Sequence, residues 1–191
     1  MGHLGAEDLA AGLETIRGAP ADAGTVEMIV RRPAQDEREI LDEGLLTLQD
    51  GLDGDDWRTR GSRATPDGAA SPDRQLTVMG SRVIDLLAAG DRGAWPLAGD
   101  QLYVDLDLGV ANLPAGTQLA IGEAVIEVTE PAHTGCAKFS ARFGSEALRF
   151  VNSPEGRALR LRGLNARVVR PGTVRRGDLI RPLPGTREDE P

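Results

Sequence analysis

The feature that most constrains the fold is an alternating apolar segment at residues 117–129, interrupted by Gly122-Glu123. The residues on both sides of this dipeptide are rich in Ile, Val and Thr, which favour extended backbone. A two-residue connection that starts with glycine is typical of a type II′ turn, whose twist matches that of two paired strands. The segment therefore predicts a β-hairpin.

Short strands of similar composition are expected at residues 25–31, 75–79, 101–105 and 178–181. A second hairpin is expected at residues 166–175, around Pro171-Gly172. Four leucines ahead of the second of these strands are expected in the core: Leu41, Leu45, Leu46 and Leu48.

One helix is expected at residues 81–89 and three more follow later in the chain, at residues 137–143, 145–151 and 153–163. The last of them has Ser153 as N-cap and Pro154 at its first position. Short strands joined by Gly- and Pro-containing turns, without regular strand–helix alternation, predict a mainly β protein: a β-barrel with several short peripheral α-helices.

The length of 191 residues fits one domain with extensions. We expect an N-terminal extension over residues 1–23, with a helical pattern, a single barrel domain over residues 24–183, and a disordered tail over residues 184–191. A single cysteine excludes an intrachain disulfide. No secretory signal and no run of 18 apolar residues is found, so we expect a cytoplasmic protein without a membrane partner.

Charge is distributed unevenly. The net charge is −8, yet residues 136–181 contain 11 basic and three acidic side chains, which leaves the rest of the chain at −16. One interpretation is a solvated arginine-rich face. The other is an electropositive site for an anionic small molecule or cofactor, such as one that bears a phosphate. The acidic total and the aromatic content of 3% disfavour nucleic acid as a partner.

Residues 131–139 contain the only cysteine, the only lysine and one of two histidines. Cys136 has three interpretations: a small buried apolar group, a thiolate nucleophile or sulfur carrier, or a ligand to a soft or transition metal. It lies at the expected start of a helix with Lys138 and Arg142 nearby, and positive charge stabilises a thiolate. This position narrowly favours the two functional interpretations.

Lys138 is interpreted as a solvated charge, an anion contact or a Schiff-base lysine. A point charge for a phosphate or sulfur anion is the more natural role, which disfavours pyridoxal phosphate as cofactor. His133 is a hydrogen-bonding turn residue or, as the alternative, a proton carrier for Cys136 or a substrate. Because His133 and Cys136 supply only two ligands and zinc sites use three or four, zinc is disfavoured as well.

Four blocks, in this order, resemble the MOSC family (molybdenum cofactor sulfurase C-terminal domain), here as a stand-alone bacterial-type member. They are Gly51-Leu52-Asp53-Gly54-Asp55, Gly99-Asp100-Gln101-Leu102, Val128-Thr129-x-Pro131 with Cys136-Ala137-Lys138, and Gly172-x-Val174-x-x-Gly177-Asp178. The usual Glu-Asn pair of the second block is Asp100-Gln101 here. Each motif is weak alone, but their order and spacing together are specific.

The resemblance implies a MOSC-like β-barrel in which Cys136 is a sulfur carrier, as a persulfide, or a molybdenum ligand. Members of the family deliver sulfur, with a sulfur-donor protein as partner, or bind molybdenum cofactor and reduce N-hydroxylated compounds. A sulfur-transferase or a molybdenum-dependent reductase is therefore implied. We predict Cys136, Lys138 and His133 as catalytic residues.

The residues predicted to bind the cofactor are Arg142, Arg167, Asp100, Gln101 and Asn165. The alternative hypothesis is a non-catalytic module that binds or delivers an anionic ligand through Arg142, Arg160 and Arg167. Both hypotheses leave the oligomeric state open.

Overall fold

A closed, seven-stranded β-barrel forms the centre of the computed structural model, which describes residues 2–62 and 65–184. The barrel strands are β1 (Gly24–Arg31), β5 (Leu76–Gly80), β6 (Leu102–Asp105), β7 (Gln118–Ile121), β8 (Ala124–Val128), β9 (Leu164–Arg170) and β11 (Leu179–Pro182). Their order is β11-β7-β8-β9-β5-β6-β1, and pairing of β1 with β11 closes the barrel. The pair β5–β6 is parallel and the other barrel pairs are antiparallel. The predicted β-barrel with short peripheral helices is thus confirmed.

The hairpin expected at residues 117–129 is present as β7 and β8, with Ala120 opposite Val125. Gly122 begins its turn with a positive φ of 53°, which a side chain would strain. The second expected hairpin is wrong. After β9, strand β10 (Gly172–Arg175) pairs with β3 (Glu43–Thr47) instead of folding back, and β3 also pairs with β4 (Gly51–Leu52). Pro171 lacks the N–H of a ladder residue, and Gly172 packs so closely on Glu123 that a Cβ would lie 2.5 Å from its carbonyl carbon.

The small sheet of β10, β3 and β4 also corrects the leucine prediction. Leu46 is fully buried, whereas Leu45 and Leu48 are 47% and 57% exposed. Successive side chains of a strand point to opposite faces, so only one face of β3 can reach the barrel core. The remaining strand, β2 (Glu39–Leu41), extends the barrel sheet beside β1.

Several barrel strands are buried on both faces, which explains their nearly continuous apolar sequences. In β1 and β6, Ile29 and Leu102 face the barrel interior, while Met28 and Tyr103 belong to a second core outside it. That second core lies between the barrel and the helices. The barrel wall therefore holds the helical layer, and with it the segment around Cys136, in a fixed position.

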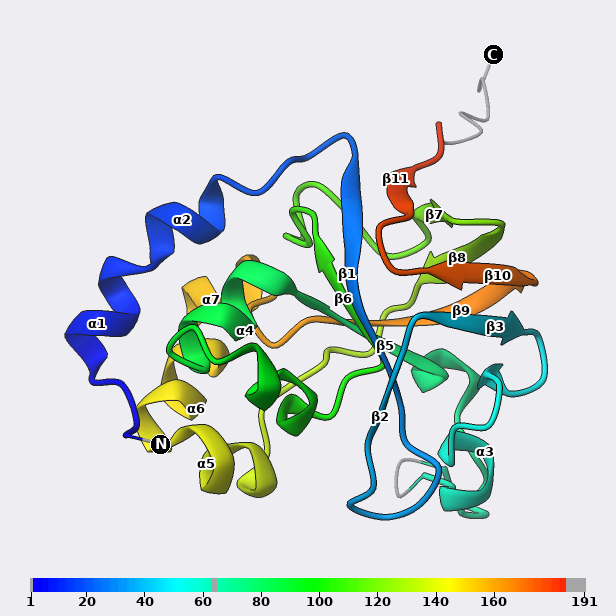
Figure 1. Ribbon diagram of the computed structural model, residues 1–191, viewed down its shortest axis with the longest axis horizontal. Coiled ribbons are helices and arrows are strands. Elements are labelled where there is room, and N and C mark those ends of the chain that lie inside the picture. The colour runs from blue at the N-terminus through cyan, green and yellow to red at the C-terminus, as the bar shows by residue number, and fades with distance from the viewer. Residues whose placement is uncertain (1, 63–64, 185–191) are drawn as a thin grey trace.

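The helices are α1 (Ala6–Ala11), α2 (Leu13–Arg17), α3 (Trp57–Arg60), α4 (Ser81–Leu87), α5 (Ala137–Phe143), α6 (Ser145–Asn152) and α7 (Pro154–Ala158), with short 3₁₀ helices at Pro72–Arg74 and Arg92–Ala98. All of the α-helices except α3 gather on one side of the barrel (Figure 1). The last helix is shorter than expected, because the chain leaves it before Arg160, whose φ is +46°.

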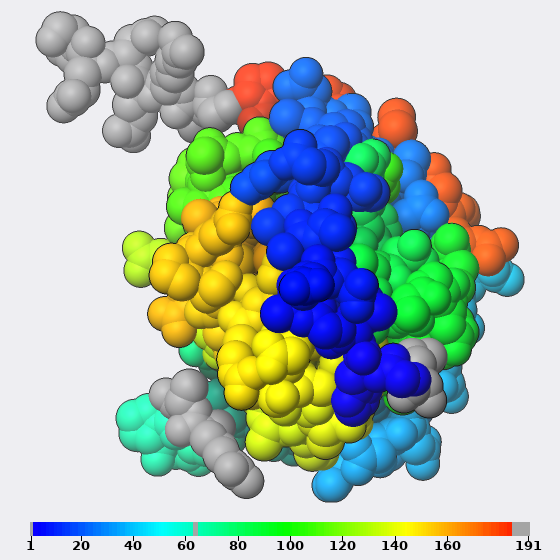
Figure 2. Space-filling model, turned by 90° about the vertical axis from the view of Figure 1, so that its left-hand side faces the viewer, coloured from blue at the N-terminus to red at the C-terminus, as the bar shows by residue number. Residues whose placement is uncertain are grey.

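The first 23 residues contain α1 and α2, which meet at Gly12. Figure 2 shows this N-terminal segment lying across the helical face, between the α5–α7 region and the region of α4. The domain boundaries proposed above remain predictions, and the expected disordered tail lies outside the described residues apart from Pro184. Within the described ranges, no helix has the length and apolarity needed to cross a membrane.

Candidate functional site

Cys136 is exposed at the N-cap of α5, at the end of the segment that leaves β8. Two asparagine side chains fix that segment. Asn165 of β9 donates to the carbonyl oxygen of Pro131 at 2.8 Å, and Asn152 of α6 accepts from the backbone N–H of Gly135 at 3.0 Å. The thiol therefore stands at a junction between the barrel wall and the helical layer.

The thiol opens into a cavity of about 370 Å³, called here the thiol pocket. Besides Cys136, its lining includes His133, Asn165 and six cationic side chains: Arg32, Arg38, Arg60, Arg74, Lys138 and Arg142. No aspartate or glutamate belongs to the lining among the described residues. Such a pocket attracts anions.

The cations differ in how far carboxylates compensate them. Arg32 is 6% exposed and makes a two-pronged ion pair with Asp55, at 2.9 and 2.7 Å. Arg60 pairs with Asp56 at 2.9 Å. These pairs fix the positions of the guanidinium groups, and their charges are largely balanced.

At the rim of the pocket the compensation is weaker. Lys138 and Arg142 share the half-exposed carboxylate of Asp36, at 3.4 and 3.3 Å. Among the residues that the structure describes, Arg38 donates only to the carbonyl oxygens of Pro96 and Glu37. The exposed side chain of Arg74 forms no hydrogen bond or ion pair within the described part of the chain.

The arginines repel one another across the pocket. Burial lowers the pKa of Arg38, and the charges of Arg142 and Arg32 lower it further. Burial and the charge of Arg32 likewise lower the pKa of Arg60. Neighbouring arginines thus add repulsion to the effect of burial at Arg38 and Arg60, and an anionic ligand would relieve that repulsion.

A buried ion pair lies behind His133. One carboxylate oxygen of Asp100 lies 2.9 Å from Nε2 of His133, and the other lies 2.6 Å from Nη1 of Arg162. Asp100 is 0% exposed. Burial alone would raise its pKa, but the positive charge of Arg162 and the contact with His133 outweigh this and lower the pKa to about 2. Asp100 is therefore ionised at neutral pH and can only accept hydrogen bonds.

The ionised carboxylate determines which nitrogen of His133 carries the proton. Burial and the charge of Arg162 lower the pKa of His133, although Asp100 opposes them, so the ring is neutral at neutral pH. Because Asp100 can only accept, Nε2 must be the protonated nitrogen, and the lone pair of Nδ1 has no donor among the residues described. The lining of the thiol pocket thus combines a thiol with an imidazole that can accept a proton.

Five of the eight predicted site residues line the thiol pocket: Cys136, Lys138, His133, Arg142 and Asn165. The other three lie elsewhere. Asp100 stands behind His133. Gln101 is fully buried and bonds to Thr77 through its amide oxygen. Arg167 pairs with Glu127 and Asp73 beside a different cavity.

The sequence did not identify four of the pocket's arginines: Arg32, Arg38, Arg60 and Arg74. They come from the acidic first part of the chain, whereas the basic segment begins at Cys136. The one sequence feature that points to any of these arginines is Asp55 of the Gly-Leu-Asp-Gly-Asp block, because a buried carboxylate needs a cationic partner. Its partner Arg32 is 23 residues away and becomes its neighbour only through the fold.

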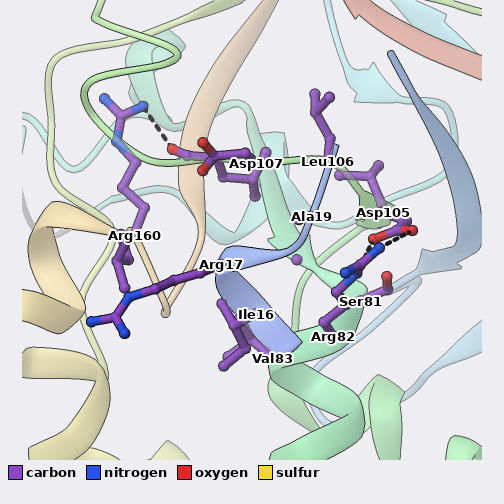
Figure 3. Close-up of a pocket in the computed structure, with 14 residues that line it drawn as sticks. Ile16, Arg17, Ala19, Ser81, Arg82, Val83, Asp105, Leu106, Asp107 and Arg160 are labelled. Atoms are coloured by element: carbon purple, nitrogen blue, oxygen red, sulfur yellow. Dashed lines mark hydrogen bonds and ion pairs between the residues drawn. The ribbon is translucent and has the colours of Figure 1, made fainter. Parts of the chain in front are cut away.

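Another cavity, of about 230 Å³, lies between α2 and the barrel and is called here the α2 pocket. Figure 3 shows Arg82 paired with Asp105 there, at 2.7 Å. Arg17, at the opposite side of the view, pairs with Glu155. No thiol or imidazole is among the lining residues described. The thiol pocket, which combines the cysteine thiol with an imidazole and a surplus of cations, is therefore the candidate site.

These features define a class: a β-barrel protein that presents a single thiol in a cationic pocket. The chain belongs to the MOSC domain family, whose sequence model matches residues 65–181. The match includes Cys136, His133 and the Asp100–Arg162 pair, while Arg32, Arg38 and Arg60 precede it. No curated protein matches the sequence.

Solved structures support the fold. The YuaD protein from Bacillus subtilis is 18% identical, with a TM-score of 0.62 over 83% of this chain and 94% of that protein. YiiM from Escherichia coli is 21% identical, with a TM-score of 0.55 over 85% of this chain and 71% of YiiM. At these identities the likeness concerns the barrel architecture alone.

Proposed function

We propose that the thiol pocket binds an anionic substrate or cofactor and that Cys136 reacts there, as a sulfur carrier or as a ligand of molybdenum cofactor. One observation carries the proposal: the only cysteine of the chain is exposed in a pocket lined by six cationic side chains. A cysteine retained for packing would instead be buried among apolar groups.

The residues suit a metal that brings its own ligands. Among the described residues no group of three His, Cys, Asp or Glu side chains is placed to hold a bare metal ion. Cys136 would provide a single sulfur ligand, and Arg38, Arg74 and Arg142 would bind the anionic groups of the cofactor. Bound there, molybdenum cofactor would supply two-electron redox chemistry, such as the reduction of N-hydroxylated compounds that the family resemblance implies.

As a sulfur carrier, Cys136 would accept sulfur from a persulfide on a donor protein. The Cys136 thiolate attacks the outer sulfur of the donor persulfide, a new sulfur–sulfur bond forms, and the donor cysteine leaves as a thiolate. His133 would take up the proton of the Cys136 thiol at Nδ1. The cations would hold the anionic persulfide that results.

Pyridoxal phosphate fits the pocket less well. A Schiff-base lysine needs a desolvated amine. The side chain of Lys138, the only lysine, is 64% exposed and lies 3.4 Å from Asp36. Lys138 is thus better suited to contact an anion.

The experiment measures what Cys136 holds. The protein is purified from a molybdenum-replete host for metal analysis, and a second sample is treated with a low-molecular-weight persulfide for intact-mass spectrometry. We expect stoichiometric molybdenum or a 32 Da increase, lost in Cys136→Ser and weakened in Arg38→Gln. Arg92→Gln, which alters an exposed arginine paired with Glu27, is the charge-matched control and should behave as wild type.

Equal loading of the wild type and Cys136→Ser would exclude a role of the thiol. If neither species forms while anion binding persists in both, the chain is a non-catalytic binding or delivery module, and the proposal fails.

A further inference from the structure

A second cavity adjoins the thiol pocket and shares two of its lining residues. This cavity, of about 330 Å³, is called here the second pocket. His133 and Asn165 line both cavities, so the two cavities meet at these side chains. A molecule bound in the second pocket would lie next to the chemical groups of the first.

Much of the lining of the second pocket is apolar. Pro114, Ala132 and Leu164 contribute to it, together with Val110, which is 47% exposed. A valine left this exposed at a cavity wall gains little from the protein's own packing. It offers apolar contact to the body of a ligand.

The charged groups of the second pocket are unevenly compensated. Arg157 is exposed, and its guanidinium group makes no hydrogen bond or ion pair within the part of the chain that is described. Arg160 donates to the carbonyl oxygens of Leu108 and Leu113 but to no carboxylate of the described residues, and burial lowers its pKa. Its positive φ is a costly backbone conformation for a residue with a side chain.

A third arginine of the same cavity has an unused donor. Arg162 is 6% exposed and pairs with Asp100, but its buried Nε has no hydrogen-bond partner. Glu130 is the one acidic side chain of the lining as described. The lining therefore contains three arginines and one carboxylate, so this side of the second pocket is positively charged.

We infer that the second pocket binds a small organic anion, whose apolar body packs on Val110, Ala132 and Leu164 and whose charge faces Arg157 and Arg160. If this anion is the substrate for the chemistry of Cys136, the inference rests on the proposed function. Binding itself does not require the thiol, so the two can be tested apart.

The test uses benzoate as the probe and benzyl alcohol as its uncharged counterpart, with isothermal titration calorimetry on the full chain. Benzoate should bind the wild type and Cys136→Ser equally, and benzyl alcohol should bind much more weakly. Arg157→Gln should raise the dissociation constant about fivefold, as expected for one exposed charge contact. Ala132→Phe, a change at an exposed position that fills the cavity, should remove binding.

Val110→Asp provides a second block through charge repulsion at an exposed position, and Arg38→Gln is the matched control because it alters the thiol pocket alone. Benzoate affinity that is unchanged in both Ala132→Phe and Val110→Asp, or that falls in Arg38→Gln but not in Arg157→Gln, would overturn the inference. Equal affinity for benzyl alcohol would overturn the assignment of an anion.

A parallel measurement separates this inference from the proposed function. Inorganic phosphate should protect Cys136 from iodoacetamide in the wild type and in Ala132→Phe alike. Protection by phosphate without benzoate binding would end the inference and leave the proposed function standing. Benzoate binding that Ala132→Phe blocks, in a protein whose Cys136 takes up neither sulfur nor molybdenum, would support the second pocket and end the proposed function.

Discussion

The thiol pocket and the α2 pocket are both lined by arginines, but they differ in how those charges are balanced. Of the three arginines that line the α2 pocket, Arg82 pairs with Asp105 and Arg17 with Glu155, while Arg160 donates to the carbonyl oxygens of Leu108 and Leu113. Asp105 and Asp107 also belong to this lining, whereas the described lining of the thiol pocket contains no carboxylate. In the thiol pocket, Arg38 and Arg74 have no carboxylate partner in the described structure. Paired arginines join elements of the fold, whereas unpaired ones retain the capacity to bind an anion. Charge balance, more than cavity shape, separates the binding site from a packing gap.

The largest effect is expected where a charge is both buried and paired. Asp100→Asn removes the counterion of Arg162, which is 6% exposed and cannot be solvated. Breaking a buried pair from one side costs about 3–5 kcal/mol. We expect a loss of that size in the free energy of unfolding, measured by urea denaturation at pH 7.

Asp105→Asn is the matched control in the α2 pocket. Its ion pair with Arg82 has side chains about 30% exposed, so solvent screens it, and the expected loss is below about 1 kcal/mol. Similar losses in Asp100→Asn and Asp105→Asn would contradict the distinction between the two pockets.

The same carboxylate predicts how stability depends on pH. The pKa of Asp100 falls from 3.8 to about 2 in the folded protein, so its ionised form stabilises the fold above pH 3.8. That contribution, about 2 kcal/mol, is lost as pH falls from about 4 through 2. Urea denaturation between pH 5 and pH 2 should show the loss in the wild type. In Asp100→Asn this part of the acid dependence should be absent, and an identical pH dependence in both proteins would refute the assignment.

The sequence was sufficient to predict the barrel because its strands have local signals. The alternation around Gly122 and the apolar pattern of residues 25–31 are each formed by residues that are close neighbours in the sequence. The connection at Pro171-Gly172 was mistaken for a hairpin because a turn motif does not state which strand the next one pairs with. Strand β10 pairs with β3, about 130 residues earlier, and only the closed barrel brings them together.

Only the part of the candidate site that lies close to Cys136 in the sequence was predictable. Cys136, His133 and Lys138 stand close together in the sequence, and their rarity draws attention to them. Arg38 and Arg74 resemble many other arginines, and their position depends on closure of the barrel. The family motif led us to predict that Asp100 contacts the cofactor. In the structure Asp100 instead lies behind His133, where it pairs with the buried Arg162, and a motif alone does not show this burial.

At the rim of the thiol pocket we expect a moderate effect on binding. Arg38→Gln removes a cation that has no carboxylate partner, so phosphate should bind about threefold to tenfold more weakly, with a smaller dependence on salt. Arg82→Gln in the α2 pocket should leave phosphate affinity unchanged. Equal weakening in both variants would show that the long-range field of the protein, and not the pocket, determines the affinity.

The smallest effect is expected for Lys138. Its side chain is 64% exposed, and its ammonium group lies 3.4 Å from a carboxylate of Asp36 that it shares with Arg142. Lys138→Met should therefore weaken phosphate binding by about twofold and change the free energy of unfolding by less than about 0.5 kcal/mol. Lys138→Arg should restore wild-type affinity, because an anion contact requires the charge and not the primary amine. A larger loss than in Arg38→Gln, not restored by arginine, would mean that the amine itself takes part in the chemistry beside Cys136.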